Sequence, residues 1–341
     1  MLKQLALTCA VTALGLVSGC AEPTDVQRIE NVLETYDADP NGDLQGVVVM
    51  LEGEVVAERY YNASDAKTLV DVRSSGKSVT SLLFGIARDQ GAIGSLDATV
   101  SEYWRETEGA PIGAVKLRDL LTMRTGLDAD GDDPSSAGYE DYLDASENPR
   151  AFVLTVPVKE PAGETYRYNS LAAYTAAHVI RTATSEPIDQ FAEDYLFGPM
   201  GIKDWRWMQD QVGDAKGQGN LFLSTRAFAQ LGQLIADEGR HEGQQIVSKD
   251  WLGESLSSIV DIGDVDPFAT EYGYYWYRRQ YPFGDKSLTV YFSSGNGGNK
   301  VMVVPEAGLV VAVTSTAYGQ GRGHRRTEAI FAEVVEAIAG E

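Results

Sequence analysis

The sequence predicts an α/β fold in which one antiparallel sheet, flanked by helices, carries an inserted and mostly helical subdomain. Two observations support this prediction. Residues that favour strands gather toward both ends of the chain, in runs such as Val47–Leu51 and Val301–Val304, whereas short helical segments and turns fill the region from Ser95 to about Asn220. Because the strands must share one core to bury their apolar faces, the region between them is expected to be an insertion.

The same patterns divide the chain of 341 residues into parts. Residues 1–19 are predicted to be a signal peptide, and residues 20–43 a tether with the first helix. Residues 44–94 together with 224–341 are expected to form the sheet domain, and residues 95–223 the helical subdomain. A chain of this length suits one large domain or two closely packed ones.

The N-terminal residues predict export from the cytoplasm. Lys3 is followed by the apolar run Leu5–Val17, which is too short to span a membrane as a stable anchor. The run ends in Val17-Ser18-Gly19-Cys20, which has the small residues and the cysteine of a bacterial lipoprotein cleavage site. We therefore expect a protein of the cell envelope that is anchored through a lipid on Cys20.

Two further features bear on Cys20. Once Cys9 is removed with the signal, Cys20 is the one cysteine left, so no intrachain disulfide is expected and a lipid would account for the odd thiol. Ala21 stands where an aspartate would retain the protein at the inner membrane, so resemblance to bacterial sorting signals favours the outer membrane, facing the periplasm. An ordinary cysteine behind a conventional cleavage site is the alternative.

The composition excludes several classes of function. There are 28 Lys and Arg against 50 Asp and Glu, a formal net charge of −22, so the protein repels nucleic acid and no such partner is expected. Three scattered histidines, without any CxxC, HExxH or paired-histidine spacing, predict no metal site and no cofactor. Residues 37–42 and 128–133 imitate calcium loops but have Val48 and Tyr139 where a glutamate is required, so the second stretch is expected to be solvated surface.

Hydrophobic periodicity and turn residues predict the individual elements. A hairpin is expected from Val47–Leu51 and Val55–Tyr61, joined through Glu52-Gly53-Glu54. The other predicted elements are helices at Val26–Tyr36, Leu171–Arg181, Ser224–Glu238, within Ile246–Leu256 and at Thr327–Ile338, and strands at Tyr272–Arg278, Leu288–Phe292, Val301–Val304 and Leu309–Thr314.

The stretch from Asp71 to Thr80 contains a serine and a lysine that could act together in nucleophilic catalysis. Ser74 and Lys77 are three apart at the start of a helix whose apolar residues recur on one face until Gly91, so Lys77 is expected one turn above Ser74. A partly desolvated lysine loses its proton more easily than a solvated one and can accept the proton of a serine hydroxyl. A phosphate-binding loop would need a glycine in place of Asp71, whereas a capping serine beside a solvated lysine is the simpler alternative.

Further motifs along the chain support a catalytic role for Ser74 and Lys77. Together with this pair, they make the chain resemble the serine β-lactamase and penicillin-binding-protein superfamily. The resemblance is greatest to the branch of class C β-lactamases, carboxylesterases and nylon-oligomer hydrolases, and it covers nearly all of the mature chain after residue 43. It implies the β-lactamase-like form of the α/β fold. The motifs are Ser74–Thr80, Leu120–Leu127, Pro161–Glu164 with Tyr168–Ser170, Leu196–Gly201 and Ser294–Gly298.

The resemblance also implies roles for individual residues. Ser74 would be the nucleophile, and Lys77 and Tyr168 would titrate as a coupled pair in which the tyrosine accepts the serine proton and returns it to the leaving group. Ser170 would face the substrate pocket. The backbone amides of Ser74 and of the strand edge near Asn296 would form an oxyanion hole. A buried structural tyrosine is the alternative for Tyr168.

The third motif departs from the family pattern. Relatives that attack penicillins carry a lysine or histidine followed by a small residue and glycine, whereas this chain has Ser293-Ser294-Gly295 or Asn296-Gly297-Gly298. We assign Ser294, Gly295 and Asn296 to this motif and to the oxyanion hole. Neither register supplies a cation, so binding of a penicillin carboxylate is expected to be weak, which favours esters and amides.

A basic stretch before the last predicted helix could supply the missing charge. It contains Arg322, His324, Arg325 and Arg326, and we take Arg322 and Arg325 as candidates for the pocket. A basic turn on the surface is the equal alternative.

The sequence therefore predicts a lipid-anchored serine hydrolase of the bacterial envelope that forms an acyl-enzyme on Ser74 and acts on a small-molecule ester or amide. One alternative is a β-lactamase or D-alanyl-D-alanine carboxypeptidase acting on penicillins or cell wall. A second alternative, from another class, is a non-catalytic envelope protein that keeps the fold for binding. The oligomeric state is left open.

Overall fold

The structure is a computed structural model that describes residues 24–283 and 286–339, so Cys20 and the predicted signal peptide lie outside it. Its largest feature is a sheet in the order β2-β1-β13-β12-β11-β10-β9-β8, in which every neighbouring pair is antiparallel. The two ends of the chain meet where β1 pairs with β13. These strands are β1 (Leu44–Leu51), β2 (Glu54–Tyr60), β8 (Val260–Asp261), β9 (Glu271–Tyr272), β10 (Tyr277–Phe283), β11 (Lys286–Gly295), β12 (Asn299–Val304) and β13 (Leu309–Ser315).

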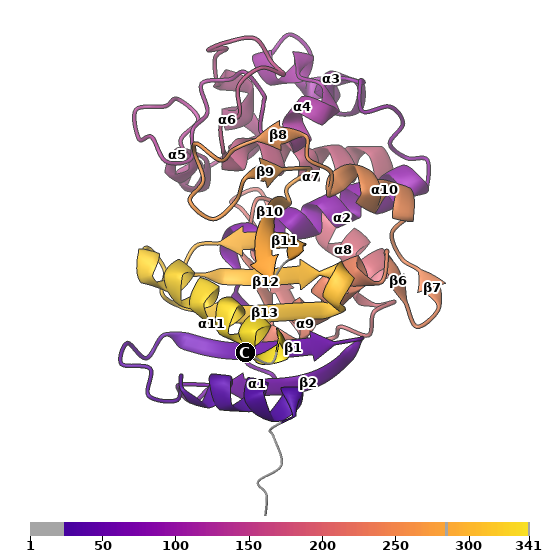
Figure 1. Cartoon of the computed structure of the whole chain (residues 1–341). Helices are drawn as coiled ribbons and strands as arrows, with labels where there is room; N and C mark the ends of the chain where they lie inside the picture. The colour runs from indigo at the N-terminus through magenta and orange to yellow at the C-terminus, as the bar shows by residue number, and fades with distance from the viewer. Residues whose placement is uncertain (1–23, 284–285, 340–341) are drawn as a thin grey trace, which may run out of the picture.

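Helices cover both faces of this sheet, because its central strands are apolar on both sides. β12 and β13 are buried along their whole length. α1 (Asp25–Glu34) and α11 (Gly321–Ala339) lie on one face, and α9 (Thr225–Ala236) lies on the other (Figure 1). Gly232 permits the close approach of α9, since a Cβ there would be 2.4 Å from Val301 Cγ2.

Most of the remaining helices gather above the sheet in Figure 1. α2 (Gly76–Asp89) lies between the two parts, and it packs against β11, α7 (Ser170–Thr184) and α10 (Lys249–Ser255). Its residues from Gly76 to Ala87 are all buried, which fits an apolar helix enclosed on every side.

The other elements are short. A small sheet has the order β3-β5-β4, and β6 pairs with β7 in a separate hairpin. The bounds are β3 (Val70–Asp71), β4 (Trp205–Trp207), β5 (Leu221–Leu223), β6 (Arg240–His241), β7 (Gln244–Gln245), α3 (Val100–Tyr103), α4 (Leu117–Leu121), α5 (Glu140–Ala145), α6 (Pro149–Thr155), α8 (Ile188–Ala192), the 3-10 helices η1 (Arg73–Ser75), η2 (Arg105–Thr107), η3 (Pro111–Ala114) and η5 (Pro305–Ala307), and the π-helix η4 (Glu193–Phe197).

The fold class predicted from the sequence is confirmed, but the predicted strand Tyr272–Arg278 is wrong as a single element. The chain turns back within it, so that Tyr272 of β9 pairs with Tyr277 of β10. The amide of Gly273 donates to Trp276 O at 2.8 Å, and Tyr275 takes a left-handed φ of 61°. The aromatic residues therefore alternate because they fill a buried turn, not because they face the two sides of a strand.

The last helix also differs from its prediction, since α11 begins at Gly321 rather than near Thr327. Glycine is a poor helix former, so Gly321 and Gly323 placed the start predicted from the sequence too late in the chain. Gly323 is nevertheless required, because a Cβ there would lie 2.1 Å from Gly297 O. The first turn of α11 thus rests directly on the glycine turn between β11 and β12.

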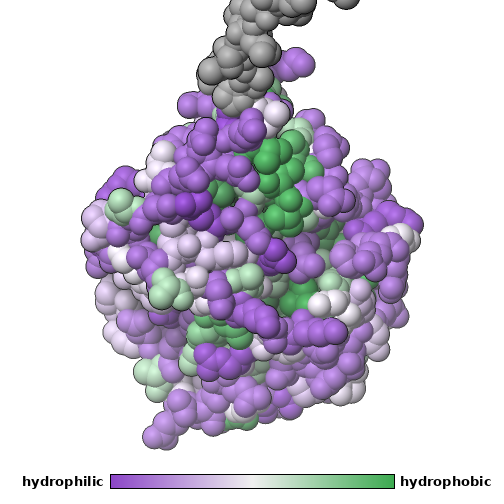
Figure 2. All heavy atoms as spheres, turned by 90° about the horizontal axis from the view of Figure 1, so that it is seen from below, coloured by the Kyte–Doolittle hydropathy of each residue, from purple (hydrophilic) through white to green (hydrophobic). Residues whose placement is uncertain are grey.

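The surface agrees with the acidic composition. Figure 2 shows the underside of the molecule as mostly hydrophilic, with hydrophobic residues in smaller separate groups. In the described part of the chain no helix combines the length and apolarity that crossing a membrane requires.

Candidate active site

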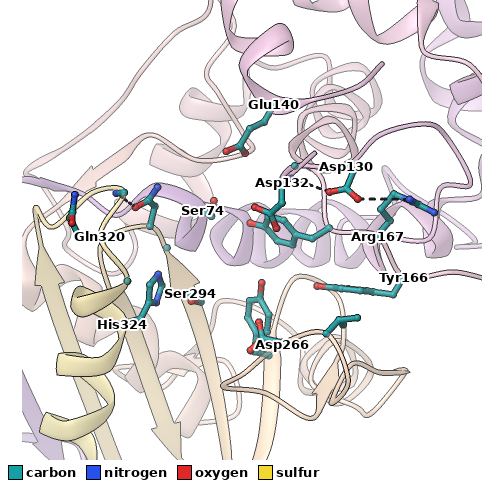
Figure 3. Close-up of a pocket in the computed structure, with 18 of the residues that line it drawn as sticks. Ser74, Asp130, Asp132, Glu140, Tyr166, Arg167, Asp266, Ser294, Gln320 and His324 are labelled. Atoms are coloured by element: carbon teal, nitrogen blue, oxygen red, sulfur yellow. Dashed lines mark hydrogen bonds and ion pairs between the residues drawn. The ribbon is translucent and has the colours of Figure 1, made fainter. Parts of the chain in front are cut away.

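A cavity of about 650 Å³ opens between the upper helices and the end of β11 (Figure 3). Ser74 faces it. Its wall combines loop residues between 130 and 140, residues 165–168, the end of β11 and the first turn of α11. Segments from both ends and the middle of the chain therefore meet at one serine.

Ser74 is presented by a strained turn. Arg73, which precedes it, has a φ of 54°, a left-handed conformation that is costly for a residue with a side chain. Two contacts hold Arg73 there: its amide donates to Asp71 Oδ1 at 2.9 Å, and its guanidinium lies 4.4 Å from the centroid of the Tyr318 ring. The fold thus maintains an unfavourable backbone geometry next to the candidate nucleophile.

Lys77 lies directly beside Ser74, and three oxygens surround its amine. Nζ is 3.2 Å from Ser74 Oγ, 3.3 Å from Ser170 Oγ and 2.7 Å from Gln218 O. Gln218 O is a carbonyl, and Ser170 Oγ donates its hydrogen to Glu140 at 2.8 Å, so both oxygens can only accept from the amine. If the amine gives up one proton, these two acceptors can hold its two remaining N–H groups, and its lone pair is then left for Ser74 Oγ.

Tyr168 lies at the cavity as predicted, whereas Ser170, predicted to face the pocket, is buried beside Lys77 and does not line it. Tyr168 lines the cavity, and Lys77 Nζ lies over its ring, 4.9 Å from the centroid. Ser170 is the first residue of α7, and Asn169 caps that helix by accepting from Ala172 N at 2.7 Å, which fixes the start of the helix beside Lys77. Within the described residues, the hydrogen bond of Ser74 Oγ is made with Lys77 and not with the Tyr168 hydroxyl.

The end of β11 touches the turn that carries Ser74. A Cβ on Gly295 would lie 2.0 Å from Val72 O and 3.0 Å from Ser75 N, so a residue with a side chain would push the strand away. The close approach brings the backbone of the strand edge and the backbone of the Ser74 turn to the same side of the cavity. This is the geometry in which amides from both segments could hold one oxyanion.

The side chains of this strand alternate between the cavity and the protein interior. Ser294 and Asn296 line the cavity. Ser293 is 1% exposed, and its Oγ accepts from Val301 N at 3.4 Å. A lysine in place of Ser293 would therefore be buried rather than presented to a substrate.

The arginines of the basic stretch point elsewhere. Arg322 pairs with Asp43 at 2.6 Å and Arg325 is exposed, so the structure places neither in the cavity, in contrast to the prediction. His324 does line the cavity (Figure 3). Burial and the nearby charge of Lys300 lower the pKa of His324 to about 4, so this side chain is neutral at neutral pH.

A cation lies behind the cavity, on β12 rather than on β11. Lys300 pairs with Ser294 across the two strands and is fully buried. Its Nζ is 2.5 Å from Glu328 Oε1, and Glu328 Oε2 is 2.5 Å from Arg279. Burial lowers the pKa of Lys300. The positive charge is thus enclosed and paired, and does not contact the cavity.

Comparison with known proteins identifies the family that shares this arrangement. The Beta-lactamase family matches residues 29–334, which is most of the chain. The chain belongs to the Beta-lactamase family. Its homologues are serine hydrolases, in agreement with Ser74 at the cavity and the buried Lys77 beside it.

Individual relatives differ in what they act on. A 6-aminohexanoate-dimer hydrolase from Paenarthrobacter ureafaciens is 24% identical over 241 residues, which are 64% of this chain and 60% of that protein, so the match spans less than two thirds of the relative. A family VIII carboxylesterase has a TM-score of 0.72 at 16% identity over 92% of this chain and 98% of its own. A class C β-lactamase from Rhodobacter sphaeroides has a TM-score of 0.65 at 16% identity over 91% and 99%. The structural matches show a common fold.

Four carboxylates at this Beta-lactamase-family cavity were missed by sequence reasoning. They come from the acidic loop, which was expected to be solvated surface, from α5 and from the loop before β9. Arg167 is the guanidinium among the lining residues, and it is paired with Glu160 at 2.8 Å and lies 3.8 Å from Asp130. The acidic character of the loop was the one available signal. The carboxylates are Asp130, Asp132, Glu140 and Asp266 (Figure 3).

Proposed function

We propose that this protein hydrolyses an ester or small amide through an acyl-enzyme on Ser74. The observation that carries the proposal is that Ser74, at the wall of the cavity, has the buried Lys77 Nζ 3.2 Å from its Oγ. Ser74 Oγ attacks the carbonyl carbon while Lys77 accepts its proton, and the carbonyl oxygen becomes an oxyanion held by the amides of Ser74 and Asn296. Collapse of this intermediate breaks the bond to the leaving group.

The second half of the reaction restores the enzyme. The leaving group departs with the proton taken from Ser74, which Lys77 or Tyr168 returns to it. A water molecule then attacks the acyl carbonyl and gives its proton to the same pair, and Ser74 leaves as the hydroxyl. Tyr168 lies at the cavity with Lys77 Nζ 4.9 Å from its ring centroid, which places it near the proton that the lysine carries. This sequence of steps uses no metal or cofactor.

The charges around the cavity support a substrate without a carboxylate near the scissile bond. Carboxylates line the wall, His324 is neutral at neutral pH, and the Lys300 charge is enclosed behind β11. A substrate carboxylate would therefore meet repulsion and, among the described residues that line the cavity, find no unpaired guanidinium or ammonium group. This favours neutral or positively charged esters and amides over penicillins.

The proposed site of action is the bacterial envelope, with the protein anchored through a lipid on Cys20 and facing the periplasm at the outer membrane. The proposal rests on the lipoprotein-like stretch Val17–Cys20. Expressed with its signal in a Gram-negative host, the protein should fractionate with membranes, and Cys20→Ala should release it or block its processing. A soluble wild-type product cleaved elsewhere would contradict the anchor.

The enzymatic proposal is tested with a neutral short-chain p-nitrophenyl ester and with the β-lactam nitrocefin. We expect kcat/KM for the ester to exceed that for nitrocefin, and Ser74→Ala to abolish turnover of both. Efficient nitrocefin turnover would replace the proposal with a β-lactamase. No turnover of either substrate and no labelling by an activity-based serine probe would favour a non-catalytic binding protein.

A further inference from the structure

Helix α5 lies at the cavity and contacts both residues, Ser170 and Gln218, whose oxygens accept from Lys77. Its first residue, Glu140, accepts the Ser170 hydroxyl hydrogen at 2.8 Å. One turn later, Asp144 Oδ1 accepts from the Gln218 side-chain amide at 3.2 Å. Positions i and i+4 share a face of a helix, so α5 presents these two carboxylates side by side.

The hydrogen bond to Glu140 decides what Ser170 can do. A hydroxyl has one hydrogen, and while Glu140 accepts it, Ser170 Oγ offers Lys77 lone pairs alone. Without this acceptor the hydroxyl could rotate and donate to the Lys77 lone pair, which would then no longer point at Ser74 Oγ. Ser170 is 4% exposed, so water offers it little alternative.

The contact with Asp144 holds the side chain of Gln218, the residue whose backbone carbonyl is the second acceptor of Lys77. Gln218 is 6% exposed, and its backbone carbonyl is the closest partner of Lys77 Nζ, at 2.7 Å. Asp144 also accepts from Lys216 Nζ at 3.1 Å, so one carboxylate holds two residues of the loop that carries this carbonyl. The Asp144 side chain is 44% exposed, so water weakens its hydrogen bonds and we expect Asp144 to contribute less than Glu140.

We propose that Glu140 and Asp144 are positioning residues, which fix the two acceptors of Lys77 and thereby direct its lone pair at Ser74. The proposal rests on the proposed function, because it assigns Lys77 the role of base. It also explains why an acidic helix stands beside the lysine, since its carboxylates hold Ser170 and Gln218.

The experiment compares the full-length protein with variants of α5 by the rate of Ser74 labelling with a fluorophosphonate and by kcat and KM for a neutral p-nitrophenyl ester. Glu140→Ala should lower the labelling rate and kcat roughly tenfold or more, with KM and the melting temperature nearly unchanged. Asp144→Ala should lower the labelling rate and kcat by roughly threefold. Glu140→Gln keeps an oxygen that can accept from Ser170, so its labelling rate and kcat should stay within about threefold of the wild-type values.

Asp141→Ala is the matched control, because Asp141 is an exposed carboxylate in the first turn of the same helix and, in the described residues, has no hydrogen bond to Ser170 or Gln218. Equal labelling rates for Glu140→Ala and Asp141→Ala would overturn the positioning proposal, and so would a rise in KM with unchanged kcat, which would make Glu140 a substrate-binding residue. A Glu140→Gln variant as slow as Glu140→Ala would also overturn it. An unlabelled wild type would instead overturn the proposed function, and this proposal with it.

Discussion

Lys77 Nζ and Ser74 Oγ lie 3.2 Å apart, although the two residues belong to different helical elements. Ser74 is in the 3-10 turn η1 and Lys77 is in the first turn of α2. The left-handed backbone at Arg73 precedes the pair, and Ser75 directs its hydroxyl away, to Asn299 O at 2.8 Å. The turn therefore selects one serine of three in this stretch to face the lysine and the cavity.

The first prediction concerns the need for a neutral amine at position 77. An arginine keeps the positive charge but does not lose its proton, so Lys77→Arg should lower kcat/KM for a neutral ester by roughly a hundredfold or more, as should Lys77→Met. Ester turnover by purified variants, with circular dichroism as a check of folding, is the measurement. A Lys77→Arg enzyme that keeps a tenth of the activity would show that the lysine supplies charge and is not the base.

The second prediction concerns substrate charge. A p-nitrophenyl ester with a carboxylate on its acyl chain should have a lower kcat/KM than a neutral ester of the same length, and the difference should shrink in high salt. In the double variant Asp132→Asn and Asp266→Asn, kcat/KM for the anionic ester should rise roughly threefold to tenfold, on the order of 1 kcal/mol, while that for the neutral ester stays constant.

Asparagine suits this test at position 266, because Asp266 Oδ1 accepts from the amides of Phe268 and Ala269 at 2.7 and 2.9 Å and an asparagine oxygen can do the same. Equal turnover of both esters by the wild-type protein would contradict the account of the cavity as acidic.

The third prediction concerns acid stability. The pKa of His324 is about 4 in the folded protein against 6.5 for an unperturbed histidine, chiefly because the side chain is buried. Between these values the unfolded chain binds more protons, so the free energy of unfolding falls as the pH is lowered from 6.5 toward 4. His324→Gln should remove this contribution, which is about 3 kcal/mol for the full shift.

The contribution of His324 to the free energy of unfolding is measured by chemical denaturation of the wild type and of His324→Gln at pH 7 and pH 4.5. The difference in unfolding free energy between the two pH values should be larger for the wild type, because the carboxylates that also titrate here are common to both proteins. The same pH dependence in both proteins would mean that His324 is not held neutral by the fold.

The site residues that could be predicted from the sequence are those that lie close together in the chain. Ser74 and Lys77 are one helical turn apart, and Tyr168 and Ser170 lie within a short motif at a helix start, so the resemblance to known family motifs could select them. Gln218 is separated from Lys77 by 141 positions, and its contribution is a backbone carbonyl, which no side-chain pattern can indicate. Its place beside the lysine depends on tertiary packing.

The errors have similar physical causes. Arg322 was taken as a pocket candidate because it is basic and precedes the last helix, but Asp43, from the start of the chain, pairs with it. The acidic stretch around residue 130 has no periodicity and was taken as solvent-facing, whereas the fold turns it over the cavity. In each case a charged residue was judged by its neighbours in sequence, and its partner in space was decisive.

The central claim is that Ser74 is an activated nucleophile, and covalent labelling tests it most directly. The protein is treated with a fluorophosphonate and the modified peptide is mapped by mass spectrometry. Ser75→Ala and Ser78→Ala are matched controls, since Ser78 Oγ donates to Tyr275 O at 2.6 Å and Ser75 Oγ also bonds to a backbone carbonyl. We predict that the wild type and both controls are labelled at Ser74 and that Ser74→Ala is not labelled. Labelling that persists in Ser74→Ala, or that maps to another serine in the wild type, would contradict the account.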